Sequence, residues 1–125
     1  MKKNIYISIL FIFLFVGNAQ AGSCTVFFSS ADCALIDKVK QIGKSKSKFP
    51  DVDSSYVSTT LKAIIKKVSS GDKDGAITLL YDPLYDYLLK VTRGSEEHRF
   101  LMVNRSSIKT LLIKIGNHPL SFLIK

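Results

Sequence analysis

Residues 54–94, SSYVSTTLKAIIKKVSSGDKDGAITLLYDPLYDYLLKVTRG, contain two helical patterns that meet at Gly71. In the first half, apolar residues recur every three or four positions, at Val57, Leu61, Ile64, Ile65 and Val68. This spacing places them on one face of an α-helix, which we expect at 53–69. The second half is denser in apolar residues. Because short helices in water need a packing partner, we predict a helical hairpin with the other segments packed around it.

The pair Asp82-Pro83 divides the second half of this stretch. Proline lacks a backbone N–H, and its ring clashes with the preceding turn of a helix. It is well tolerated at the first position of a new helix. We therefore expect a break here, with one helix at 75–81 and another at 83–93.

The predicted turn contains Gly71, Asp72, Ala76 and Ile77, and their spacing resembles the turn and second half of a tetratricopeptide-type repeat. Lys73 stands where an aromatic residue usually follows Gly-Asp. The sequence shows no second copy at a period of about 34 residues. From this resemblance we take only the geometry of a helical hairpin.

Helical spacing also occurs on both sides of the hairpin. Before it, we expect a helix at 31–42 that stops at Gly43 in the left-handed conformation. After it, we expect Ser95 to cap one helix and Ser106 or Ser107 to cap a last one. The predicted fold class is all-α: a small single-domain bundle of five or six short helices around a helical hairpin.

Residues 1–21 have the pattern of a secretory signal peptide. Two lysines precede an apolar run at 5–16, and an A-x-A pattern ends at Ala21. The alternative is a retained membrane anchor, but this run is shorter than the ~20 residues that a spanning helix needs. We expect cleavage after Ala21, which leaves one domain at 22–125 with a formal charge of +6. The predicted location is periplasmic or secreted.

Cys24 and Cys33 both lie in the domain that remains after cleavage. In an oxidising compartment such a pair tends to form a disulfide. The bridge would fasten the apolar segment 25–28, expected to be extended or irregular, to the first helix. The spacing excludes a redox C-x-x-C motif. Acylation of Cys24 is the alternative, because residues 21–24 loosely resemble a lipobox.

A cluster of lysines follows the first predicted helix. Five lysines fall within eleven residues, at Lys38, Lys40, Lys44, Lys46 and Lys48. They form either a solvated loop or an anion site for phosphate, a lipid headgroup or an acidic partner. No aromatic residue is interleaved among them, so the stacking platform expected for single-stranded nucleic acid is missing.

Tyrosines and carboxylates gather late in the hairpin, at Tyr81, Tyr85 and Tyr87 and at Asp82 and Asp86. The tyrosines either bury their rings in the core or anchor a binding partner. The two aspartates lie four residues apart. A solvated pair on a helix surface is a simpler interpretation of this spacing than an acid–base or metal pair.

No motif of catalysis, metal binding or cofactor binding is present. His98 and His118 lack the spacing of metal ligands, and no phosphate-binding glycine loop occurs. We therefore predict no catalytic residue, metal or cofactor. We expect an exported non-catalytic binding protein, such as a periplasmic inhibitor or immunity-type protein, whose partner protein presents an acidic surface. One alternative is a basic binder of membrane surfaces or polyanions that uses the lysines from Lys38 to Lys48 together with Lys62, Lys66 and Lys67. Another is an envelope hydrolase. A nucleic-acid partner is not expected.

Overall fold

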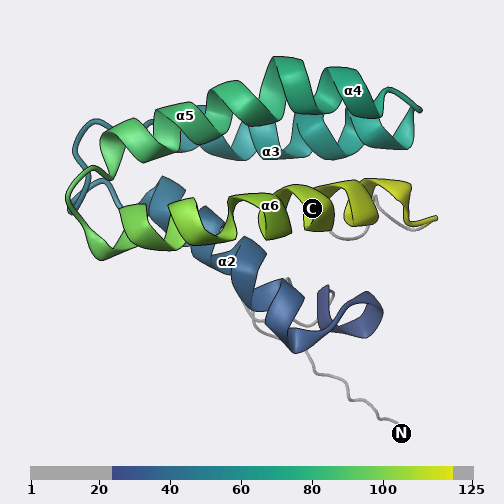
Figure 1. The fold of residues 1–125 in the computed structure, drawn as a ribbon, viewed down its shortest axis with the longest axis horizontal. Coiled ribbons are helices and arrows are strands. Elements are labelled where there is room, and N and C mark those ends of the chain that lie inside the picture. The colour runs from purple at the N-terminus through teal and green to yellow at the C-terminus, as the bar shows by residue number, and fades with distance from the viewer. Residues whose placement is uncertain (1–23, 120–125) are drawn as a thin grey trace, which may run out of the picture.

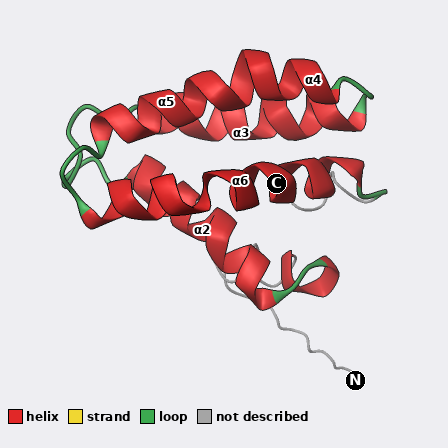
Figure 2. Ribbon diagram, viewed as in Figure 1, coloured by secondary structure: helices red, strands yellow, loops and turns green. Residues whose placement is uncertain are grey.

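The computed structural model describes residues 24–119, and every regular element in this range is helical (Figure 2). The all-α prediction is confirmed for this part of the chain. The predicted signal peptide and the apolar tail at 120–124 lie outside the described residues. The elements in chain order are α2 (Ser30–Lys44), α3 (Ser54–Ser69), α4 (Lys73–Gly75), the π-helical segment η1 (Ala76–Tyr81), α5 (Asp82–Val91) and α6 (Glu96–Asn117).

The hairpin consists of α3 and the coil formed by α4, η1 and α5, which returns alongside it (Figure 1). Gly71 joins the two arms with a φ of 93°, a conformation that glycine adopts without strain. Asp53 caps α3 by accepting a hydrogen bond from the Tyr56 N–H at 3.1 Å. Asp72 caps the second arm by accepting from the Gly75 N–H at 2.9 Å. Each carboxylate satisfies a backbone donor that the helix leaves unpaired.

The predicted break at Pro83 is wrong, because the helical coil continues from α4 through η1 into α5. The residues before the proline keep right-handed helical angles, with φ −68° and ψ −52° at Tyr81. The Asp82 N–H bonds to the carbonyl of Ile77, five residues earlier. This wider π turn lies directly before Pro83, so the chain absorbs the proline by widening the helix instead of ending it.

The segment after Gly94 also forms one helix where we expected two. Ser95 caps α6 as predicted, since its hydroxyl accepts from the His98 N–H at 3.2 Å. Ser106 and Ser107 lie exposed in the middle of α6 and cap nothing. The buried residues Leu101 and Ile108 are seven apart, so they share one face across the polar stretch between them.

Two glycines allow the helices to cross closely. Gly43 is the last residue but one of α2 and is not in the left-handed conformation, which corrects the predicted stop at this residue. A Cβ atom built at Gly43 would lie 2.6 Å from Val57 Cγ1 of α3. On α6, a Cβ atom at Gly116 would lie 2.5 Å from Val68 Cβ. The absence of a side chain at both positions therefore sets how closely α2 and α6 approach α3.

The buried residues form one continuous apolar cluster around α3. This helix contacts α2, η1 and α6, and α2 crosses the long helices obliquely (Figure 1). The largest fully buried side chains are Tyr81, Tyr85, Ile42, Ile64, Leu84, Leu88, Leu101, Ile108, Leu111, Leu112, Ile115 and Val39. The two arms of the hairpin, α2 and α6 all contribute to this core, which holds α2 in place beside α3 and α6.

Candidate functional site

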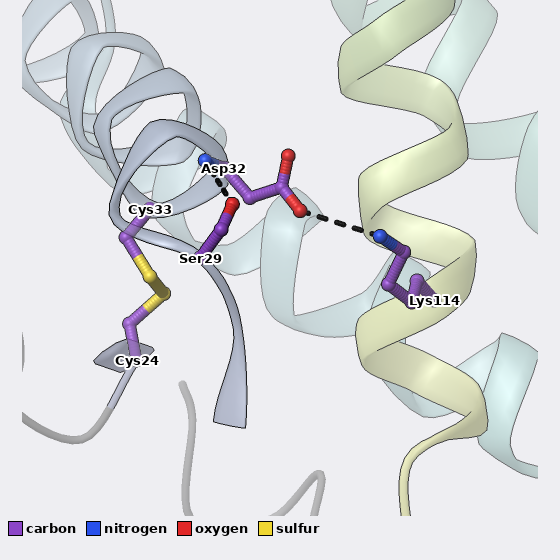
Figure 3. Close-up of a disulfide and its surroundings, with 5 residues drawn as sticks. All are labelled: Cys24, Ser29, Asp32, Cys33 and Lys114. Carbon is purple, nitrogen blue, oxygen red and sulfur yellow. Dashed lines mark hydrogen bonds and ion pairs between the residues drawn. A yellow bond between two sulfur atoms is a disulfide. The ribbon is translucent and has the colours of Figure 1, made fainter. Parts of the chain in front are cut away.

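Cys24 and Cys33 form a disulfide with a Cα–Cα distance of 5.9 Å (Figure 3). The predicted bridge is therefore confirmed, and the Cys24 sulfur is not free for acylation. Residues 24–27 form a helical turn, where we expected extended or irregular chain. This turn is held by a bond from the Phe28 N–H to the Cys24 carbonyl at 2.9 Å.

The bridged segment also contacts α6. The side chain of Asp32, in the first turn of α2, pairs with Lys114 of α6 at 3.3 Å (Figure 3). The rings of Phe27 and Phe28 lie 4.6 Å and 5.5 Å from the ring of His118. The disulfide therefore fixes a segment that connects the start of α2 with the end of α6.

Tyr81 and Tyr85 belong to the core, so neither ring is available as the predicted partner anchor. Each side chain is 1% exposed, and the ring centroids lie 5.2 Å apart. The Tyr81 hydroxyl donates to the carbonyl of Arg105, and the Tyr85 hydroxyl to the carbonyl of Leu101. Burial raises the pKa of both phenols, which keeps these hydroxyls protonated as donors.

Tyr87 has a different position from the other two tyrosines. It is half-buried, and its hydroxyl accepts from the Asp53 N–H at 2.6 Å and donates to the Asp51 carbonyl at 3.0 Å. Its ring packs edge-on against Tyr56 with a centroid distance of 5.0 Å. Tyr87 therefore holds the loop before α3, and a binding role for it remains a prediction.

Asp82 and Asp86 both face one arginine of α6. Arg105 lies 3.5 Å from Asp82 and 3.3 Å from Asp86, and its guanidinium stacks 5.0 Å from the centre of the Tyr85 ring. The two carboxylates share one arginine, which offsets one of their two negative charges, an arrangement typical of a structural contact on a partly exposed surface.

The structure separates the five clustered lysines into two pairs and a single exposed lysine. Lys38 and Lys48 face the start of α6, where Lys38 lies 5.9 Å from the centre of the Phe100 ring. Lys48 pairs with Glu97 at 2.7 Å, and this bond lowers the pKa of the Glu97 carboxyl. Lys46 is exposed in the loop that follows α2. Lys40 and Lys44 lie on the opposite side, toward α3.

Lys40 and Lys44 meet Lys62 of α3 at the mouth of a cavity between the two helices. Among residues 24–119, none of these three lysines has a carboxylate within the 4.0 Å of an ion pair. Burial lowers the pKa of Lys40; nearby Asp37 raises it, and Lys44 and Lys62 lower it further. We call Lys40, Lys44 and Lys62 the basic cluster.

The basic cluster is the strongest candidate site in the described part of the chain. Protein-family models, curated proteins and solved structures were all compared, and none matches. Within residues 24–119, no group of three or more His, Cys, Asp or Glu side chains could hold a metal ion. No described helix is long and apolar enough to cross a membrane.

The sequence alone named all three members of the basic cluster, because the membrane-surface alternative combined the stretch from Lys38 to Lys48 with Lys62, but it did not predict their geometry. Lys62 is eighteen positions after Lys44 in the chain, so spacing alone did not show that the two lie side by side. Lys62 lies on the face of α3 opposite the apolar residues, so the sequence did indicate that it is exposed. Only the crossing of α2 over α3 brings it beside the lysines of α2.

Proposed function

We propose that this chain is an exported, non-catalytic binding protein that recognises an acidic surface of a partner protein through the basic cluster and Lys46. The single observation that supports this is the gathering of Lys40, Lys44 and Lys62 with no carboxylate at ion-pair distance among residues 24–119, and only Asp37 nearby. Like charges placed together repel one another, and an acidic surface docked against them would relieve that repulsion. A periplasmic inhibitor or immunity-type protein is the kind of protein we propose.

Export is part of the same proposal. The Cys24–Cys33 disulfide is compatible with an oxidising compartment, where such bridges persist. The n-region, apolar run and A-x-A pattern of residues 1–21 favour cleavage after Ala21. Mass spectrometry of the exported protein tests this step. An N-terminus at Gly22 supports the proposal, and an N-terminus at Met1 contradicts it.

Partner capture with matched charge variants tests the binding role. The exported protein is immobilised and exposed to envelope proteins at low and high salt. The Lys44→Glu/Lys46→Glu variant should lose a captured protein that the unaltered chain releases at high salt. The control is Lys73→Glu/Lys90→Glu, which changes the net charge equally at exposed positions on α4 and α5.

Two outcomes would contradict the protein partner. Equal losses in both charge variants would show a response to net charge alone. Failure to capture any protein, combined with sedimentation on anionic vesicles that Lys44→Glu/Lys46→Glu abolishes, would favour the alternative of a membrane-surface binder. The captured partner is then purified and its affinity for each variant is measured. The Lys44→Glu/Lys46→Glu variant should again bind more weakly than the control variant and the unaltered chain.

A further inference from the structure

A cavity of about 190 Å³ lies beneath the basic cluster, between α2, α3 and α6. Its inner lining is apolar and comes from all three helices: Ile36 from α2, Val57, Leu61 and Ile65 from α3, and Leu112 and Ile115 from α6. These side chains are at most 7% exposed. The cavity therefore reaches into the hydrophobic core and is not a shallow depression on the surface.

The mouth of the cavity has the opposite character. Lys44, Lys62, Ser54 and Ser58 are exposed, and Lys40 is half-buried beside them. Asp37 is the one carboxylate among the lining residues. Three cations against one anion leave an excess of positive charge where the apolar interior meets water. The hydroxyls of the two serines add hydrogen-bond donors at the same level.

Lys40 connects the two parts of the cavity. It lines the cavity and is half-buried, and burial disfavours the charged form of its amine. A negatively charged group placed among Lys40, Lys44 and Lys62 would relieve both this desolvation and the mutual repulsion of the lysines. An uncharged or cationic head group would relieve neither.

We propose that this cavity binds a small amphipathic carboxylate, with its apolar tail inside and its head group among the three lysines. An apolar cavity of about 150 Å³ holds a benzene molecule, so this one suits a tail of roughly six to eight carbon atoms. Inorganic phosphate alone would leave the apolar interior unfilled. The inference does not depend on the protein partner, because the cavity is complete within a single chain.

Calorimetry on the exported protein with its disulfide intact tests the site, using octanoate, 1-octanol and octylammonium as probes. The three share a tail and differ in the charge of the head group. Hydrogen bonds to a charged partner contribute about 1.5–3 kcal/mol, so octanoate should bind about ten- to a hundredfold more tightly than 1-octanol. Octylammonium should show no binding.

Three variants locate the site. Lys40→Met/Lys62→Met should reduce octanoate affinity to about that of 1-octanol. Lys66→Met/Lys90→Met is the matched control, because it also removes two positive charges, and both lysines are exposed and do not line the cavity. Ser58→Trp places a large ring at the exposed mouth and should abolish binding of both probes, while circular dichroism keeps the helical spectrum.

Several results would overturn the proposal. Equal affinities for octanoate and 1-octanol would remove the role of the lysines, and unchanged binding to the Ser58→Trp variant would place the ligand elsewhere. If octanoate binds only a chain ending at Pro119, residues 120–125 occupy the cavity in the full protein. Lys46→Glu distinguishes octanoate binding from binding of the protein partner. Lys46 does not line the cavity, so this variant should still bind octanoate.

Discussion

At the scale of single residues, Tyr81 and Tyr85 fix how the hairpin meets α6. Their hydroxyls donate to the carbonyls of Arg105 and Leu101, which are four residues apart and in the reverse chain order. Turning α6 about its axis would break both bonds together, whereas a slide of one full turn would bring other carbonyls of α6 to nearly the same places. The pair therefore fixes which face of α6 meets the hairpin, a choice that apolar contacts alone would leave less well defined.

These hydroxyls predict an alkaline limit to stability. Burial raises the pKa of both tyrosines above the ordinary 10.0, so the folded state keeps protons that the unfolded state loses. The stabilisation is full below pH 10 and should decline as the pH rises above it. Urea unfolding between pH 8 and 11 should show a smaller decline for Tyr81→Phe/Tyr85→Phe than for the unaltered chain.

The same double variant should lose about 1–3 kcal/mol of unfolding free energy at pH 7, because two hydrogen bonds are removed. Tyr56→Phe is the control: Tyr56 is 37% exposed and should leave the alkaline decline unchanged. Parallel pH profiles for the double variant and the unaltered chain would show that the buried phenols do not cause the decline.

At the scale of elements, periodicity predicted most helices, and the errors have local causes. The polar stretch 104–107 interrupted the apolar pattern, so one helix was read as two. It belongs to α6 because Arg105 covers Tyr85 with its guanidinium and offers its carbonyl to Tyr81. At Pro83, the rule for an ideal α-helix did not include the π turn that accommodates the ring.

The cavity could not have been predicted from the sequence, because it depends on how two helices cross. The sequence showed that Lys40 and Lys44 are polar neighbours one helical turn apart. Their approach to Lys62 depends on the crossing of α2 over α3, which Gly43 permits against Val57. A helix end and a close crossing both favour glycine, and the pattern alone did not distinguish them.

Gly43→Ala tests this crossing. The added methyl would overlap Val57 Cγ1, and overpacking of this kind costs about 1–3 kcal/mol, partly offset by the ~1 kcal/mol gain in helix propensity. We expect a net loss of stability in urea unfolding. Val57→Ala should rescue part of it, so the double variant should be more stable than the sum of the single changes predicts. Strict additivity would contradict a direct contact.

At the scale of the whole molecule, the ends of the described chain are held together through α2. The disulfide fastens residues 24–27 to the first turn of this helix, while Asp32 and the Phe27 ring connect the same region to α6. The ion pair is partly exposed and contributes little by itself. The covalent bridge is therefore the main constraint on the N-terminal turn, and Cys24 also lines the cavity.

Removing the bridge should weaken both the fold and the site. Cys24 and Cys33 are nine residues apart, and closing a loop of this length contributes about 2.5 kcal/mol in the chain-entropy description. Cys24→Ser/Cys33→Ser should unfold at lower urea concentration by about this free energy and bind octanoate more weakly. The unaltered chain should match it after reduction, whereas reductant should not affect the variant. Unchanged stability with weaker octanoate binding would show that the bridge shapes only the cavity, because the core around α3 then holds α2 without it.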